Sequence, residues 1–174
     1  FSLEGKTAIL TGAGGFFGIH FTQALLEFGA RVILIELAPE KLRFFSEEYK
    51  NRYMSYFVDL YDYRAAAECY GNILESEKRI DILVNNAFDF SSCTGFCPDD
   101  SGTLRKASYD QLRCAFDSGI YWAVQATQIF GGHMQDTGNG SIINICSMCS
   151  VVAPDPELYA GTQHSPNPPG YSIV

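Results

Sequence analysis

Thr11-Gly12-Ala13-Gly14-Gly15-Phe16-Phe17-Gly18 directly follows the apolar run 7–10 and leads into an amphipathic stretch. This pattern predicts a strand, a tight glycine-rich turn and then a helix. Gly12 permits the tight turn, and Gly18 lets the helix lie close to the strand. The missing Cβ of Gly14 or Gly15 leaves room for a pyrophosphate, which the helix N-terminus would favour electrostatically. The stretch therefore predicts a dinucleotide phosphate site.

A second apolar run, 32–35, ends at Glu36, eighteen positions beyond Gly18. A carboxylate at this place accepts hydrogen bonds from the ribose hydroxyls of NAD and repels the 2′-phosphate of NADP. Arg31 lies at the start of that run, which is the wrong end of a strand to hold a 2′-phosphate. We therefore expect the cofactor NAD in preference to NADP.

Length and composition fit one globular domain. The chain has 174 residues, 47% of them hydrophobic, which is enough for one sizeable core and too few for two. A net charge of −8 argues against nucleic acid and against a membrane as partners. No apolar run approaches the roughly 18 residues of a membrane span, and no signal-peptide pattern is present. We expect a cytoplasmic protein. We also expect that its start has been trimmed, because the sequence begins with Phe1 and not with methionine.

The six cysteines are interpreted as reduced side chains that are buried or half-buried. They are Cys69, Cys93, Cys97, Cys114, Cys146 and Cys149. The alternative is zinc held by two pairs, 93/97 and 146/149, which follow the fourth and fifth expected strands. The first spacing is loose and Ser147, inside the second pair, is needed for another role, so we expect no metal. The three histidines, His20, His133 and His164, have no partners at ligand spacing.

Apolar segments alternate between strand-like and helix-like periods along the whole chain. Strands are expected at 6–11, 31–36, 53–58, 80–85 and 140–146. Helices are expected at 16–29, 39–50, 63–78 and 109–135, the last opened by a capping box at Ser108–Gln111. Right-handed crossovers then give an α/β fold with a doubly wound parallel sheet, a Rossmann fold with strand order 3-2-1-4-5.

Four further segments resemble short-chain dehydrogenases/reductases. Asp81–Ala87 is similar to the fourth strand of that family, and Val58–Leu60 resembles its segment that contacts adenine through an aspartate. Asn144–Ser147 resembles the end of the fifth strand, where the serine is catalytic, and Pro169–Ser172 resembles the segment with the catalytic tyrosine. The resemblance covers nearly the whole chain, and its order and spacing are more specific than any one motif.

The resemblance and the glycine turn together imply a set of site residues. The expected cofactor-binding residues are Thr11, Gly12, Gly14, Gly15, Phe17, Gly18, Glu36, Asp59, Leu60, Asn86 and Ala87. The expected catalytic residues are Ser147, Tyr171 and Gly119, the last at the usual asparagine position. In relatives the helix that carries Trp122 packs against its counterpart, so the resemblance also implies a homo-oligomer, a dimer or tetramer.

Two positions depart from the family pattern. The glycine turn has the spacing of the extended branch of the family, which includes nucleotide-sugar epimerases, at Thr11, Gly12, Gly15 and Gly18. The segment Asn85–Ala87, in contrast, is typical of the short branch. We give the strand motif more weight because one glycine can shift while the turn still forms. Gly119 lacks the side chain of the usual asparagine, but it keeps the carbonyl that holds a water in the proton relay and tolerates a helix kink.

The catalytic tyrosine is assigned to Tyr171 and not to Tyr159. A free tyrosine hydroxyl has a pKa of about 10, so the family stabilises the phenolate with a lysine four residues later. Four residues after Tyr159 the sequence has Gln163, which carries no charge. Four residues after Tyr171 would be position 175, and the sequence ends at Val174. We therefore expect a C-terminally truncated domain without its last strands, inactive when these residues are made alone, with 152–167 as an inserted loop.

The function expected from these residues is hydride transfer between NAD(H) and a secondary alcohol or ketone. The inserted loop is a pointer to a carbohydrate-like substrate, because a similar insertion occurs in relatives that act in surface-sugar biosynthesis. Two alternatives stay open. One is a nucleotide-sugar epimerase or dehydratase that uses bound NAD transiently, and the other is a dinucleotide-binding module without turnover.

Overall fold

The computed structural model describes residues 1–42, 49–152, 154–162 and 166–174. They form two compact units. Unit 1 consists of Phe1–Ala87 and Trp122–Ile145, and unit 2 consists of Phe88–Tyr121 and Cys146–Val174. The expectation of a single dinucleotide-binding domain over the whole chain stays a prediction.

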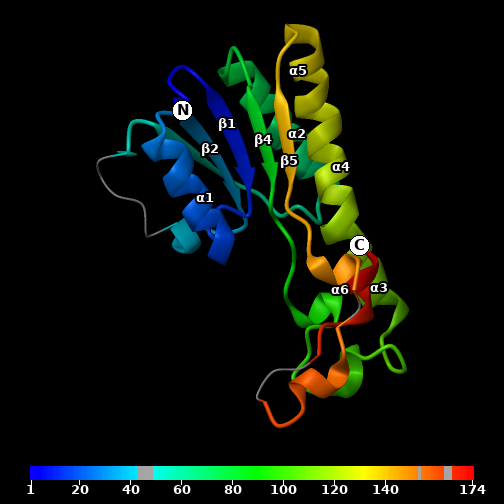
Figure 1. The fold of residues 1–174 in the computed structure, drawn as a ribbon. Coiled ribbons are helices and arrows are strands. Elements are labelled where there is room, and N and C mark those ends of the chain that lie inside the picture. Colours follow the sequence, from blue (N-terminus) through cyan, green and yellow to red (C-terminus); the bar gives the residue numbers. More distant parts are fainter. Residues whose placement is uncertain (43–48, 153, 163–165) are drawn as a thin grey trace. The chain divides into compact units, whose positions relative to one another are not determined.

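A five-stranded parallel sheet forms the centre of unit 1 (Figure 1). Its strands are β1 (Thr7–Thr11), β2 (Arg31–Glu36), β3 (Tyr53–Phe57), β4 (Ile82–Asn85) and β5 (Ser141–Asn144). The order is β3-β2-β1-β4-β5, with Ile9 of β1 opposite Ile33 of β2 and Leu83 of β4. The predicted α/β fold class and strand order are confirmed.

Helices cover both faces of this sheet (Figure 1). They are α1 (Phe16–Glu27), α2 (Tyr63–Ser76), α4 (Trp122–Ala126) and α5 (Gly132–Thr137). Side chains alternate along each strand, so Ile9 faces the core under α2, α4 and α5, whereas Ala8 and Leu10 face the core under α1. Each core contains side chains that are fully buried, such as Phe130 in the first and Leu26 in the second.

The region predicted as one helix over 109–135 alternates between α and π geometry. A capping box of Ser108 and Gln111 opens α3 (Tyr109–Phe116), as predicted. The π-helical segments Asp117–Tyr121 and Thr127–Gly131 precede α4 and α5. A π turn holds one extra residue, which rotates the following side chains by about 100° relative to an α-helix. Ile120, inside the first π-helical segment, is 38% exposed, and Phe116, the last residue of α3, is 42% exposed.

The remaining elements are short. The helix predicted at 39–50 is a 3₁₀ turn, Pro39–Leu42, in its described part, and 43–48 lie outside the described residues. Unit 2 contains η3 (Ser92–Thr94), η4 (Asp100–Gly102), η7 (Met148–Ser150), η8 (Pro156–Tyr159) and α6 (Pro169–Ile173). The predicted inserted loop 152–167 contains η8, while Gln163 and His164 lie outside the described residues.

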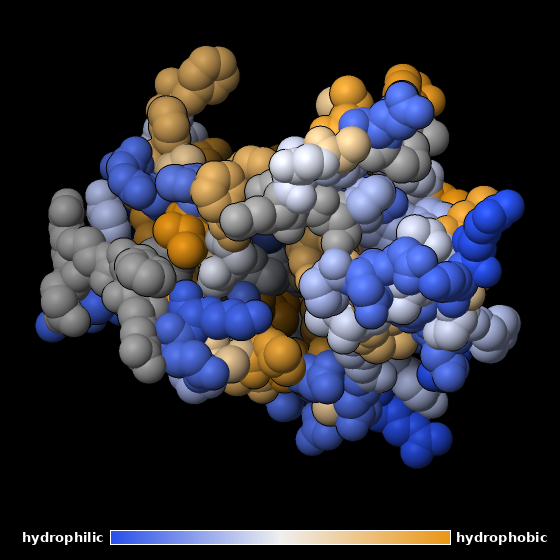
Figure 2. Space-filling model, turned by 90° about the horizontal axis from the view of Figure 1, so that it is seen from below, coloured by the Kyte–Doolittle hydropathy of each residue, from blue (hydrophilic) through white to orange (hydrophobic). Residues whose placement is uncertain are grey.

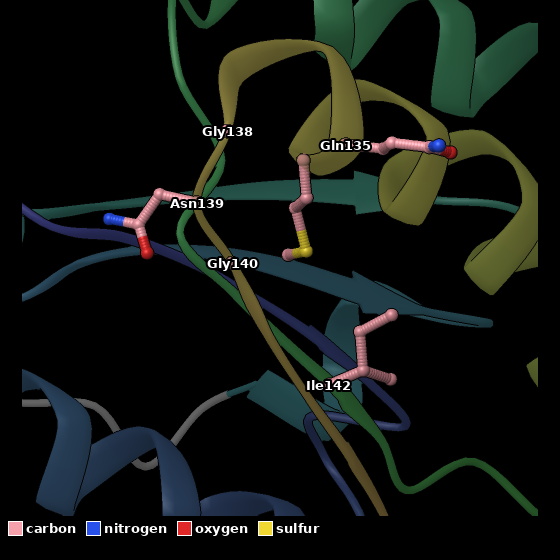
Figure 3. Close-up of a pocket in the computed structure, with 6 residues that line it drawn as sticks. Gln135, Gly138, Asn139, Gly140 and Ile142 are labelled. Carbon is pink, nitrogen blue, oxygen red and sulfur yellow. The ribbon is translucent and has the colours of Figure 1, made fainter.

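A shallow hollow of about 400 Å³ lies between α5 and β5 (Figure 3). Its lining consists of Met134, Gln135, Gly138, Asn139, Gly140 and Ile142. None of these six residues was predicted as a site residue. The hollow is open to solvent and contains no charged side chain, so we assign it no function.

Large apolar side chains are also exposed at many places. Figure 2 shows apolar side chains interspersed with hydrophilic ones on the face that is seen. Tyr121 and Val124, which flank Trp122 on the long helix, are 67% and 43% exposed. None of the helices in the described ranges has the length and apolar character needed to cross a bilayer.

Asp81, at the start of β4, joins the beginnings of β1 and β4. Its carboxylate is 5% exposed, accepts the Thr7 backbone N–H at 3.1 Å, and pairs with Lys6 and Arg79. Burial alone would raise the pKa of Asp81, but the Thr7 N–H and the two cations outweigh it and lower that pKa.

We expect Asp81→Asn to lower the free energy of unfolding by about 1–3 kcal/mol at pH 7. Because the pKa of Asp81 is lower in the folded state, its carboxylate stabilises the fold above the unfolded-state value near 4, and this stabilisation is lost as pH falls. Urea unfolding at pH 7 and at pH 3 measures both effects. Asp136→Asn, at an exposed position of α5, is the matched control. If Asp81→Asn lowered the free energy of unfolding equally at pH 7 and at pH 3, the stabilising role of the Asp81 carboxylate would be contradicted.

Candidate functional site

The turn between β1 and α1 requires glycine at two positions. Gly12 has a positive φ of 66°, and a Cβ on it would lie 2.8 Å from the Cα of Ala87. A Cβ on Gly18 would overlap the carbonyl oxygen of Gly12. The turn is also tied to β2, because the N–H of Gly12 donates to the carbonyl of Ile35 at 2.9 Å. These contacts hold the first residues of α1 close to the carboxyl ends of β1 and β4.

The N-terminus of α1 is suited to bind an anion. Its N-cap is Gly15, which has no side chain to cap the helix, and its first turn contains no acidic residue. The first backbone N–H groups of a helix have no partner within it, so those of Phe16, Phe17 and Gly18 remain available for phosphate oxygens. The Phe16 and Phe17 side chains are 78% and 56% exposed.

Glu36 lies beside this turn and is 6% exposed. One carboxylate oxygen accepts the Gly14 N–H at 2.8 Å, and the other accepts the Leu37 N–H at 2.7 Å. The Lys41 ammonium lies 3.7 Å from the second oxygen. A Cβ on Gly14 would lie 2.5 Å from the Lys41 Cβ, so this glycine is required by the packing of the protein itself. Glu36 therefore has a second role, as an anchor of the loop, that the sequence did not indicate.

Thr11 and Asn86 bind each other and hold the end of β4 against the glycine turn. The Thr11 hydroxyl accepts the N–H groups of Asn86 and Ala87, each at 3.1 Å. The Asn86 amide donates to the carbonyls of Thr11 and Gly12 at 3.1 and 3.0 Å. Both side chains are thus occupied within the protein, which makes them positioning residues in this structure.

Asp59 and Leu60 follow β3 in unit 1. The Asp59 carboxylate accepts the Tyr61 N–H at 2.9 Å and is exposed, whereas Leu60 packs against the core under α2. Arg31 forms a two-pronged ion pair with Glu77, which raises the pKa of the guanidinium and keeps it at the opposite end of β2 from Glu36. All eleven predicted cofactor residues belong to unit 1.

The three predicted catalytic residues belong to unit 2. Ser147 accepts the Cys149 N–H at 3.1 Å and so caps η7. Tyr171 lies in α6, a helix that contacts both η7 and α3. Gly119 lies in the π-helical segment after α3, where a Cβ would overlap the side chain of Val174 and lie 3.3 Å from the Phe88 ring. Any larger residue at position 119 would therefore displace the end of α6.

An aromatic cluster around Tyr171 was not predicted from the sequence. The ring centroids of Phe88, Phe96 and Phe90 lie 5.2, 5.5 and 5.7 Å from that of Tyr171. Phe90 is 62% exposed, whereas the other three rings are partly buried. The three phenylalanines fall within the nine residues 88–96 that come soon after β4, and this grouping is the one sequence signal that could have indicated them.

The cysteines and histidines show no arrangement for binding a metal. Cys97 accepts a hydrogen bond from the Gln111 amide, and Cys149 accepts one from Asn167. In the described part of the chain, no three His, Cys, Asp or Glu side chains are grouped closely enough to hold an ion. The absence of a metal and the reduced state of the thiols stay predictions.

Comparisons with known proteins identify the family. The family model for short chain dehydrogenase matches residues 6–163. A sorbitol dehydrogenase from Cereibacter sphaeroides is 31% identical over 150 residues, covering 83% of this chain and 54% of its own length. The chain therefore spans about half the length of this curated relative.

Two solved structures are similar as well. An NAD⁺-bound xylitol dehydrogenase has a TM-score of 0.80 at 22% identity, with 99% of this chain and 60% of that chain covered. A metagenomic short-chain oxidoreductase in complex with NADP has a TM-score of 0.78 at 26% identity, with 99% and 71% covered. The match of the family model over most of the chain places this protein in the short-chain dehydrogenase/reductase family.

Proposed function

We propose that this chain is part of an NAD-dependent oxidoreductase that interconverts a secondary alcohol and its ketone. The observation that carries the proposal is the uncapped N-terminus of α1 beside the glycine turn and the buried Glu36 carboxylate. The helix N-terminus would favour a pyrophosphate, and the carboxylate would accept hydrogen bonds from a ribose. When bound, the nicotinamide accepts or donates the hydride.

The residues of unit 1 would hold that cofactor. The backbone N–H groups of Phe16, Phe17 and Gly18 would donate to the pyrophosphate. Glu36 would accept hydrogen bonds from the ribose hydroxyls with the lone pairs that the Gly14 and Leu37 N–H groups leave free. Asp59 and Leu60 would border the adenine, and Ala87, packed against Gly12, would keep the glycine turn in place.

The residues of unit 2 would handle the proton. The Tyr171 oxygen would take the proton of the alcohol or return it to the forming alkoxide. The Ser147 hydroxyl would donate a hydrogen bond to the substrate oxygen as charge develops on it. The Gly119 carbonyl would hold a water of the proton relay. No described residue hydrogen-bonds the Tyr171 hydroxyl, which supports its availability for this exchange.

The compartment and the oligomeric state of this enzyme are also proposals. Family members act on small molecules, and the solved structures named above include both NAD and NADP complexes. We expect a cytoplasmic homo-oligomer, a dimer or tetramer, because α4, the helix that carries Trp122, exposes the apolar side chain of Val124. The match to a short-chain dehydrogenase model supports net oxidation or reduction over epimerisation.

We expect the protein to bind NAD more tightly than NADP. Glu36→Gln keeps an oxygen that accepts the Gly14 N–H but removes the negative charge. It should therefore narrow the difference in affinity between NAD and NADP. Glu36→Ala should weaken NAD binding by about 1.5–3 kcal/mol, because a charge-assisted ribose contact is lost. Calorimetric titration of both cofactors measures these changes, with Glu75→Gln on α2 as the control. Equal or tighter binding of NADP by the unmodified protein would contradict the prediction.

Tyr171→Phe should lower kcat by about 10²–10⁴-fold, because the ring and its packing remain while the oxygen that accepts the proton of the alcohol is lost. The measurement is NADH formation from secondary alcohols by a chain that includes the lysine expected at position 175. Tyr159→Phe, the tyrosine that we did not assign, is the matched control and should leave kcat unchanged. Undiminished turnover by Tyr171→Phe would mean that another residue transfers the proton.

A further inference from the structure

Three phenylalanines enclose the ring of Tyr171. Phe88 and Phe96 meet it edge to face, with interplanar angles of 74° and 76°, and Phe90 is tilted by 53°. The three rings also contact one another, with centroids 4.9 Å apart for Phe88 and Phe90 and 5.1 Å for Phe90 and Phe96. Such ring pairs favour further apolar or aromatic groups beside them. The ring of Tyr171 thus lies in contact with three other aromatic rings.

The polar groups of the same segment are bonded within it. The Asp89 carboxylate accepts the Ser91 N–H and the Ser91 hydroxyl, both at 2.9 Å. The Thr94 hydroxyl donates to the Asp89 carbonyl at 2.6 Å. A polyol bound beside the Phe cluster would need a hydrogen-bond partner for each hydroxyl, and a hydroxyl buried without one costs several kcal/mol. The surroundings of Tyr171 therefore suit an apolar group better than a chain of hydroxyls.

The residues that follow the two predicted catalytic side chains are also apolar and exposed. Met148, directly after Ser147, is 77% exposed, and Val151 is 86% exposed. Ile173, two residues after Tyr171, is 57% exposed. This second observation is independent of the ring contacts. Both catalytic segments of unit 2 thus present apolar side chains near the residues that would touch the substrate.

We propose that the substrate carries an aryl or similarly bulky apolar group next to the reacting carbon, and that this group packs on Phe88, Phe90 and Phe96. The proposal rests on the proposed role of Tyr171. Oxidation breaks the C–H and O–H bonds of the carbinol and forms the C=O bond of an aryl ketone. The hydride reduces NAD⁺ to NADH, and the proton passes to the phenolate oxygen of Tyr171, which becomes the neutral phenol. The sorbitol and xylitol dehydrogenases named above act, by their names, on a different class of alcohol.

Two measurements on the full chain test the substrate class. The first is the dissociation constant of acetophenone and of fructose, measured by calorimetry in the presence of NAD⁺, which has no hydride to give to a ketone. The second is kcat/KM for NADH formation from 1-phenylethanol and from sorbitol. We expect acetophenone to bind at least tenfold more tightly than fructose, and 1-phenylethanol to exceed sorbitol at least tenfold in kcat/KM.

Phe90 provides the decisive variant because its exposure allows substitution without removing a core residue. Phe90→Ala should weaken acetophenone binding about tenfold, and Phe90→Leu should restore part of the loss. Phe28→Ala, at a half-exposed phenylalanine of unit 1, is the matched control and should bind acetophenone unchanged. Tighter binding or faster turnover of the sugar ligands, or acetophenone binding insensitive to Phe90→Ala, would overturn this proposal while hydride transfer itself stood. Phe90-dependent acetophenone binding without turnover of either alcohol would instead overturn the proposed function.

Discussion

The close contact between Gly12 and the backbone of Ala87 is the constraint on which the cofactor side of the molecule depends. It brings the turn after β1 against the end of β4, and a side chain on Gly12 would separate them. The hydrogen bonds between Thr11 and Asn86 hold the same junction from the other side. The N-terminus of α1 lies where it does because this junction fixes the direction in which the chain leaves β1.

The sheet could be predicted because each of its strands is a short apolar run bounded by polar or glycine residues. All five strands fall within the predicted ranges, and the capping box at Ser108 opens α3 as predicted. The π-helical segments could not be predicted, because an α-helix and a helix with one extra residue in a turn share almost the same apolar spacing.

The candidate site was predictable to a different degree in each unit. Gly12, Gly18 and Glu36 have short-range geometric requirements that the sequence displays directly. Tyr171 could be proposed only through the resemblance, and its aromatic neighbours depend on how the segment after β4 folds back onto α6. Contacts of this kind join residues about eighty positions apart and leave no periodic signal. The hydrogen bond from the Gly14 N–H to Glu36, which anchors the loop, also leaves no periodic signal, and so it was not anticipated.

That bond has a consequence for protein engineering. A redesign that aims to change the preferred cofactor would usually begin by exchanging the acidic residue at the end of β2 for a small or basic one. Here such an exchange also releases the Gly14 N–H, which is otherwise held at 2.8 Å, and removes the partner of Lys41. The choice between NAD and NADP and the order of the glycine turn therefore both depend on the Glu36 side chain. A successful redesign must supply a new acceptor for Gly14 together with the new phosphate ligand.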